Sequence, residues 1–142
     1  MAEEKKVKIE IESVIEDLSD DGFPESTDKT SSLADGIYSS DGNTKVIRYT
    51  ETEDGEESQS TITVSDNAVT VKRSGRANYL FVFEEGKSTA TLYSVPPYSF
   101  DTEIYTRKIR LSLDSEGGEL SLIYDMTIGG AKKKTRMKVR VK

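Results

Sequence analysis

The sequence predicts an all-β fold, a closed antiparallel meander β-barrel of roughly 8–10 strands with little or no helix. Apolar and polar residues alternate with a period of two, as from Thr135 to Val141, where every second residue is Lys or Arg. Turn signals recur about every 8–12 residues, and no window carries a sustained helical period. The turns are too short for crossovers, so strands that follow one another should pair. Closure into a barrel would then remove the exposed edges of the sheet.

The strands can be placed in order along the chain. The first is expected at about residues 5–15, and the polar, turn-rich stretch at about residues 17–30 is expected to be an exposed loop. Asp35-Gly36 and Asp41-Gly42-Asn43 read as turns. The other strands are expected at about residues 29–34, 37–40, 44–51, 59–64, 69–73, 78–83, 88–93, 100–107, 108–113, 119–127 and 134–141. Residues 1–142 should form a single domain.

The alternation also predicts which side chains fill the barrel. On each strand the apolar positions should share the inner face, since neighbouring residues of a strand point to opposite sides. The expected inner set is Val7, Ile9, Ile11, Val69, Val71, Phe81, Phe83, Ile109, Leu111, Leu113, Leu120, Leu122, Tyr124, Met137, Val139 and Val141.

The composition argues against several kinds of site. The chain has no cysteine and no histidine, so it offers no thiolate or imidazole for metal binding or catalysis. Acidic clusters such as Asp17, Asp20 and Asp21 lack the ligand spacing of a calcium-binding loop, and we expect no metal and no cofactor. Ser74 lacks the flanking glycines and the base of a nucleophile elbow. We therefore expect no enzymatic activity and no catalytic residue.

The lack of cysteine is compatible with the cytoplasm. The residues after Met1 form no apolar stretch of the length that a signal peptide or membrane helix requires. We expect a soluble cytoplasmic protein without a membrane partner.

Charge is distributed unevenly along the chain. The net charge is −6, with 18 acidic against 6 basic residues over residues 1–66 and 8 against 14 over residues 67–142. The basic excess culminates in the last strand, where Lys134, Arg136, Lys138 and Arg140 should share the outer face. Such a stripe is able to contact an anion or a nucleic acid through its phosphates. It lacks interleaved aromatic residues for base stacking, and a solvated strand face that prevents aggregation is the simpler explanation.

Several aromatic residues are expected to point into the barrel. We predict a ligand pocket at one barrel mouth, lined by Tyr79, Tyr93, Tyr124 and Arg76. Tyrosines pair an apolar ring with a directional hydroxyl, and an arginine is able to neutralise a carboxylate or phosphate. The alternative is that the aromatic rings simply fill the barrel while Arg76 extends over its rim.

An ordered series of motifs over residues 73–141 resembles the YwiB-like family of uncharacterised bacterial proteins. The motifs are Arg73-Ser74-Gly75, Phe81-Val82-Phe83, Glu85-Gly86-Lys87-Ser88-Thr89, Tyr93-Ser94-Val95-Pro96, Leu113-Asp114-Ser115-Glu116-Gly117-Gly118 and Leu120-Ser121-Leu122-Ile123-Tyr124-Asp125-Met126. The resemblance implies a small calycin-like (lipocalin-type) β-barrel without an assigned activity. The chain departs from the family pattern at Pro97, which follows Pro96 where the family tends to have an aromatic-Gly turn, and in its lack of histidine.

Two functions remain open at this point. One is a non-enzymatic, small-molecule-binding barrel of the bacterial cytoplasm. The other is an interaction module that binds an acidic partner such as RNA through the basic face of its last strand. An apolar cavity inside the barrel favours the first, whereas a filled barrel with a contiguous cationic surface favours the second.

Overall fold

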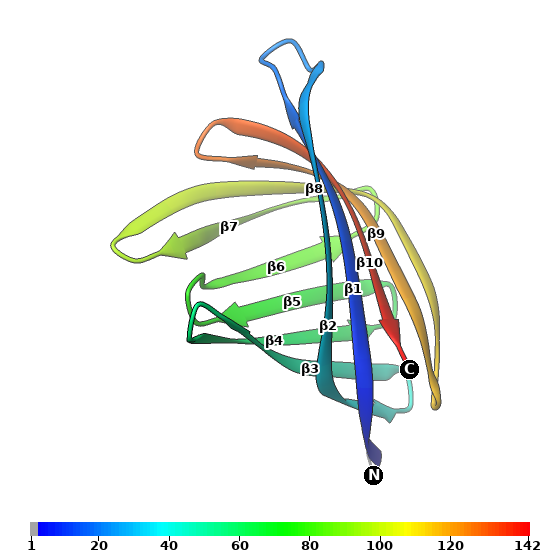
Figure 1. The fold of residues 1–142 in the computed structure, drawn as a ribbon. Helices are drawn as coiled ribbons and strands as arrows, with labels where there is room; N and C mark the ends of the chain where they lie inside the picture. Colours follow the sequence, from blue (N-terminus) through cyan, green and yellow to red (C-terminus); the bar gives the residue numbers. More distant parts are fainter. Residues whose placement is uncertain (1–2) are drawn as a thin grey trace.

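The computed structural model describes residues 3–142 and contains ten antiparallel strands (Figure 1). The strands are β1 (Glu3–Leu18), β2 (Pro24–Asp41), β3 (Thr44–Glu53), β4 (Glu56–Ser65), β5 (Ala68–Ser74), β6 (Tyr79–Glu84), β7 (Ser88–Val95), β8 (Tyr98–Asp114), β9 (Gly117–Ile128) and β10 (Ala131–Val141). Strands, turns and short connections account for all the described residues, among which no helix is long and apolar enough to cross a membrane.

The ten strands form one sheet in the order β6-β5-β4-β3-β2-β1-β10-β9-β8-β7. Strands that follow one another in sequence therefore pair, except β6 and β7, and β1 pairs with β10, which confirms the predicted meander. The sheet curls into a nearly closed barrel whose seam lies between β6 and β7. A backbone bridge joins Asn78 and Ser94 at this seam, with N···O distances of 2.8 and 2.9 Å, and Thr89 Oγ1 donates to Val82 O at 2.8 Å.

The two ends of the barrel differ. In an up-and-down meander, the turns that follow the odd-numbered strands share one end, which we call the hairpin end. The other end holds both termini and the remaining turns (Figure 1). The long β1–β2 hairpin projects beyond the barrel at the hairpin end (Figure 1).

The segment predicted as an exposed loop at residues 17–30 is exposed, but most of it is not a loop. β1 continues to Leu18 and β2 begins at Pro24, and the two pair along the way, for instance Glu16 with Thr27. This hairpin extends past the barrel, so neither face packs on a core. The alternation that identifies a half-buried strand is therefore missing there.

Asp35-Gly36, expected to be a turn, lies inside β2. A Cβ on Gly36 would lie 2.5 Å from Arg48 O and 2.8 Å from Ile9 Cγ1, so the glycine permits a close approach between strands. The pairing of β2 with β3 also ends here, at Gly36 and Tyr49. Beyond this point β2 pairs only with β1, and β3 only with β4.

The core occupies the inner face of the barrel. Ten of the sixteen predicted inner residues are buried, and five more, Val7, Ile11, Ile109, Leu113 and Met137, are partly buried and pack against the core. The apolar core residues absent from the prediction come from β2, β3, β4 and β8: Ala34, Tyr38, Ile47, Tyr49, Ile62, Val64 and Ile104.

The prediction of burial is wrong for one residue of this set, Leu111, which is 40% exposed. It pairs with the buried Leu120 of β9 and so shares the inner side of the sheet. However, β7 pairs with β8 only as far as Tyr105. The last part of β8 therefore has no strand on that side, and Leu111 borders an open groove instead.

Candidate functional site

The inner face changes from apolar to polar toward the hairpin end. On β3, Ile47 is followed on the same face by Tyr49 and Glu51, and on β5 Val71 is followed by Arg73. β4 lies between these strands and contributes the buried Ser60, two residues from Ile62. Three adjacent strands thus bring a carboxylate, a guanidinium and hydroxyl groups together inside the barrel.

Arg73 is the central residue of this polar cluster. Its Nη1 lies 3.2 Å from Glu51 Oε1 and 3.3 Å from Ser60 Oγ. The side chains of Arg73 and Glu51 are 22% and 27% exposed, so the pair is mostly shielded but still reached by solvent. Burial disfavours the charged guanidinium, but the nearby Tyr79 and Glu51 outweigh this effect and raise the pKa of Arg73.

Aromatic rings from β6 and β7 lie beside the polar cluster. The rings of Tyr79 and Phe81 stack with centroids 4.0 Å apart and planes 17° apart. Tyr93 lies across the seam from Tyr79, with the ring centroids 5.4 Å apart and the planes 14° apart. The three rings are therefore almost parallel and present flat apolar surface next to Arg73.

Tyr124 on β9 extends the aromatic cluster. Its ring centroid lies 4.7 Å from that of Phe83. Burial raises the pKa of Tyr124 to about 12 and also raises the pKa of Tyr79, so both phenols stay protonated at neutral pH and are able to donate hydrogen bonds.

Two buried hydroxyl groups flank Tyr124. Thr106 and Thr135 are its partners on β8 and β10, and their side chains are 0% and 2% exposed. Neither Oγ1 has a hydrogen-bond partner among residues 3–142. The Thr135 hydroxyl is close enough to Tyr124 to offset part of the rise in its pKa, although the two do not reach hydrogen-bond geometry. Unpaired buried hydroxyls carry a free-energy cost that a bound molecule or water is able to relieve.

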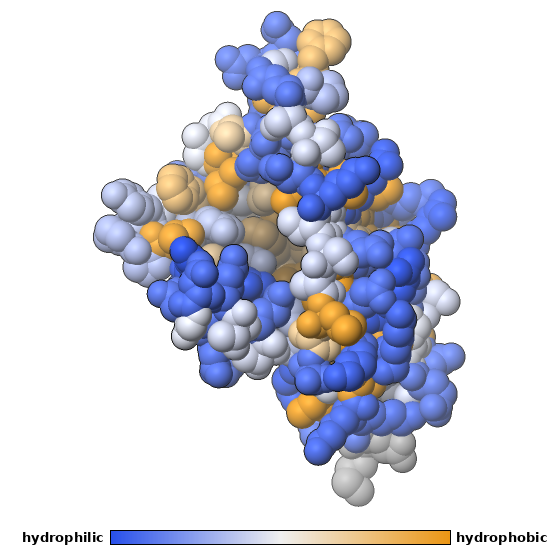
Figure 2. Space-filling view, viewed as in Figure 1, coloured by the Kyte–Doolittle hydropathy of each residue, from blue (hydrophilic) through white to orange (hydrophobic). Residues whose placement is uncertain are grey.

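Solvent reaches this part of the interior. Tyr79, Tyr93, Ile11 and Ser13 lie on the inner face yet are only partly buried, whereas a closed, filled barrel would bury them. Figure 2 shows a hollow with apolar residues inside it, beside the upper part of β2. The opening agrees with the divergence of β2 from β3 in the part of β2 that precedes Gly36.

Three of the four predicted pocket residues meet in this interior. Tyr79 contacts Tyr93 directly, and Phe81 and Phe83 connect them to Tyr124. Arg76 does not lie with them.

Arg76 belongs to the β5–β6 turn, where its side chain is 54% exposed. Its nearest acidic groups are Asp54, 3.4 Å away, and Glu56, 3.8 Å away, both at the β3–β4 turn. The inward arginine is instead Arg73, which the prediction missed. The alternation along β5 indicates its inward position, because Arg73 follows Val69 and Val71 on the same face of the strand.

The predicted cationic stripe lies on the outer face of β10, but acidic residues flank it. Lys134 and Arg140 each lie between an acidic residue of β1 and one of β9, and Lys138 lies beside Glu12 of β1, whereas Arg136 lies between Val14 and Ile123. Arg140 contacts Glu10 at 2.8 Å, Glu12 at 3.3 Å and Glu119 at 3.1 Å, while Lys138 lies 3.8 Å from Glu119. The acidic and basic halves of the sequence thus meet at the β1–β10 pairing and partly neutralise each other.

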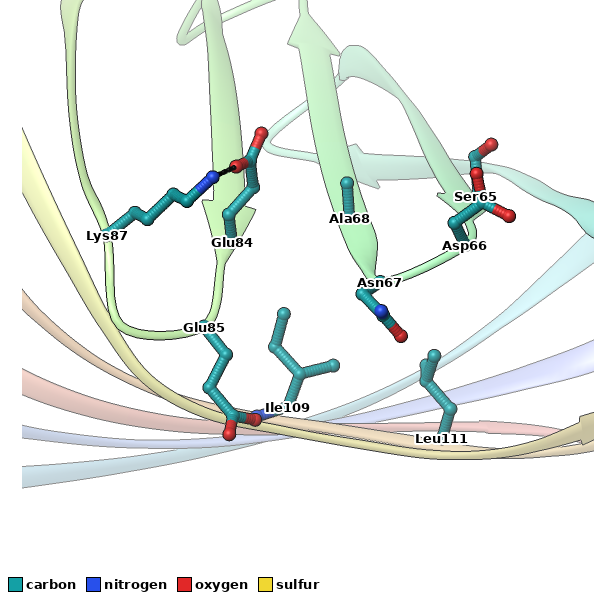
Figure 3. Close-up of a pocket in the computed structure, with 9 residues that line it drawn as sticks. All are labelled: Ser65, Asp66, Asn67, Ala68, Glu84, Glu85, Lys87, Ile109 and Leu111. Atoms are coloured by element: carbon teal, nitrogen blue, oxygen red, sulfur yellow. Dashed lines mark hydrogen bonds and ion pairs between the residues drawn. The ribbon is translucent and has the colours of Figure 1, made fainter.

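A separate groove lies at the end of the barrel that holds the termini (Figure 3). Its volume is about 870 Å³, and it runs between the β4–β5 turn, the β6–β7 turn and β8. Glu85 Oε2 accepts a hydrogen bond from Ile109 N at 2.9 Å, and Glu84 pairs with Lys87 at 3.1 Å. Glu85 satisfies a backbone donor where β7 no longer pairs with β8, so these carboxylates have structural partners. Residues 3–142 contain no group of three side chains suited to a metal ion.

The fold and the interior together define a ten-stranded antiparallel meander barrel with an aromatic and polar inner surface at one end. The chain belongs to the family described as "Domain of unknown function (DUF1934)", whose family model matches residues 9–139. This membership confirms the resemblance inferred from the motifs.

Two comparisons support the assignment to this family. The chain is 30% identical over 129 residues to the uncharacterized beta-barrel protein YwiB of Bacillus subtilis, covering 91% of this chain and 87% of that protein. It also resembles the crystal structure of the YwiB protein from Bacillus subtilis, with a TM-score of 0.79 and 26% identity over 96% of this chain and 92% of the other.

Proposed function

We propose that this protein is a non-enzymatic, small-molecule-binding barrel, and that the ligand occupies the aromatic and polar interior at the hairpin end. The observation that carries the proposal is the composition of the inner face there. Nearly parallel rings of Tyr79, Phe81 and Tyr93 stand beside the guanidinium of Arg73, and Tyr79 and Tyr93 are only partly buried. A concave apolar wall with a few convergent polar groups is typical of ligand sites.

The unpaired hydroxyls support the same proposal. Thr106 and Thr135 lie buried on either side of Tyr124, and their hydroxyls find no hydrogen-bond partner in the part of the chain that the structure describes. A stable core normally pairs such groups, and binding sites are a common place for the exceptions. The arrangement is compatible with a calycin-like ligand barrel, in which the interior rather than the surface holds the small molecule.

The ion pairs of β10 argue against the alternative, an acidic partner such as RNA bound to the outer face of that strand. A phosphate would compete with Glu10, Glu12 and Glu119 for Arg140. No aromatic residue interleaves with the cations along β10, so this strand offers no aromatic ring on which a base could stack. A bacterial cytoplasmic location is part of the proposal, and the cysteine-free sequence is compatible with it.

Native mass spectrometry of protein purified from its own host tests the proposal, because it detects a small molecule that stays bound through purification. A thermal-shift screen against acidic metabolites, aromatic compounds and fatty acids complements it, since a ligand at one hundred times its dissociation constant stabilises the native state by about 2.7 kcal/mol. We expect a bound species or a hit whose shift falls in Tyr79→Leu. Tyr98→Leu is the matched control, because Tyr98 is 66% exposed at the β7–β8 turn. The absence of any retained ligand and of any hit, or hits unaffected by Tyr79→Leu, would contradict the proposal.

A further inference from the structure

We propose that the interior site selects planar aromatic molecules that carry an acidic group, and that Arg73 binds that group while the rings of Tyr79 and Tyr93 stack on the aromatic part. This inference rests on the proposed function and specifies the class of its ligand.

The hydrogen bonds of Arg73 leave one side of its guanidinium available. Both contacts within residues 3–142 use Nη1, namely those to Glu51 and Ser60. Nε and Nη2 make no hydrogen bond to a described residue. A guanidinium has five N–H donors in a planar fork, and the Nε–Nη2 edge matches the two oxygens of a carboxylate, sulfonate or phosphate.

Glu51 and Ser60 hold the guanidinium in place. They approach from β3 and β4, which lie on the same side of β5. A bound arginine of this kind loses little conformational freedom when a ligand arrives, and this preorganisation favours affinity. The 22% exposure of the Arg73 side chain shows that it is accessible without being fully hydrated.

The aromatic surface lies next to this cation. Tyr79 is close enough to Arg73 to influence its ionisation, and Tyr93 lies nearly parallel to Tyr79 across the seam. The 5.4 Å between these two centroids is too small to admit another ring, and Phe81 already stacks on Tyr79 with the centroids 4.0 Å apart, so a planar ligand would stack against the outside of this three-ring cluster. An acidic group attached to such a ring system would then be near the guanidinium.

The neutral hydroxyls are able to serve a ligand that carries an anion. Protonated phenols and threonine hydroxyls are able to donate hydrogen bonds to ligand oxygens. Tyr79, Tyr124 and Thr106 supply such donors along the inner face. Glu51 is already engaged by Arg73, which lowers its ability to attract a cation.

Two fluorescent probes with the same rings test the charge preference. Anilinonaphthalene sulfonate carries a sulfonate, and N-phenylnaphthylamine lacks it. We expect wild-type protein to bind the sulfonate about tenfold more tightly, as a charge-assisted bidentate contact would give. Arg73→Gln should weaken sulfonate binding by about tenfold and change binding of the uncharged probe by less than about twofold. Arg76→Gln is the control and should leave both affinities unchanged.

Glu51→Gln tests the same contact in the opposite direction. It removes the competing negative charge but keeps an amide oxygen that accepts the hydrogen bond from Arg73 Nη1, so the guanidinium stays in place and sulfonate affinity should rise. Thermal melting of each variant verifies folding. Should Arg73→Gln fail to fold, this variant decides. Binding of both probes with equal affinity, or a sulfonate affinity that does not rise in Glu51→Gln, overturns the charge preference and leaves the proposed function standing. If neither probe binds, the result contradicts both the charge preference and the proposed function.

Discussion

Arg73 and Glu51 contact each other inside the barrel, 3.2 Å apart, although β4 separates their strands. An arginine and a glutamate on the inner face of a small β-barrel occupy positions where apolar residues would otherwise extend the core. Ser60 of β4 lies between them and accepts a further hydrogen bond from the same nitrogen. The pair lies where the inner face changes from a packed apolar surface to a polar surface that is only partly buried.

Removal of one member of this pair should destabilise the fold. Arg73→Gln and Glu51→Gln are each expected to lower the free energy of unfolding by about 1–2 kcal/mol, between the values for exposed and buried ion pairs. The double variant should cost less than the sum of the two, because the second change removes a charge already left unpaired. Urea denaturation of the four proteins measures the coupling, and strictly additive effects would show that the pair contributes nothing.

The apolar part of the core should respond strongly to truncation. Leu122→Ala removes a side chain that is 1% exposed and should cost about 2–5 kcal/mol through lost transfer free energy and a cavity. Leu111→Ala is the matched control. Leu111 lies on β8, two residues beyond Ile109, the partner of Leu122, and it is 40% exposed. Its cost should be below about 1 kcal/mol. Equal losses in denaturant melts would contradict the assignment of the core.

Acid should weaken the β1–β10 pairing. Hydrogen bonds from Lys142 and Arg140 hold the pKa of the Glu10 carboxyl below its usual 4.5. A carboxyl with a lowered pKa in the folded state stabilises the fold above its unfolded pKa, and this contribution is lost as the pH falls through the folded value. Stability should therefore decline as the pH drops below about 4.5.

Glu10→Gln tests this assignment, since the variant should show a shallower decline of the melting temperature with acid than wild type. Glu103→Gln, on the exposed side of β8, is the control and should keep the wild-type slope. An unchanged slope in Glu10→Gln would show that other carboxyls cause the acid sensitivity.

Alkaline stability should depend on the buried phenols. Burial raises the pKa of Tyr124 to about 12, above its ordinary value of 10.0. The neutral phenol therefore stabilises the folded state fully below pH 10, and this contribution is lost as the pH rises toward 12. Tyr124→Phe should unfold at higher pH than wild type and lose one late step in the absorbance titration of tyrosinate. A wild-type titration curve in this variant would show that Tyr124 is not the late-ionising group.

The meander and most of the core could be predicted from the sequence because they depend on alternation. Val69, Val71, Phe81 and Phe83 repeat with period two, and each is buried. The segment at residues 17–30 could not be recognised as strand in this way, because it projects from the barrel and has no buried face. Its pairing depends on backbone hydrogen bonds, which leave no signal in hydropathy.

The candidate site was predicted in part. Tyr79, Tyr93 and Tyr124 were placed inside by the strand pattern, and the structure brings them together. Arg76 follows the Ser74-Gly75 break in the sequence, which suggests a place at the barrel mouth, whereas the alternation along β5 indicates that Arg73 points inward. Glu51 and Tyr49 lie outside the predicted set, because the inner positions of β3 become polar toward the end of the strand.

The most direct test of the proposed interior site is nuclear magnetic resonance of protein labelled with ¹³C in its tyrosine rings, titrated with N-phenylnaphthylamine. The seven tyrosines are spread between the interior and the surface. We predict saturable shifts for Tyr79, Tyr93 and Tyr124, because a bound aromatic molecule changes the ring-current field around them. Tyr98 and Tyr105, which are 66% and 38% exposed, should keep their positions. Shifts confined to Tyr98 or Tyr105, or no saturable shift at all, would contradict a binding site inside the barrel.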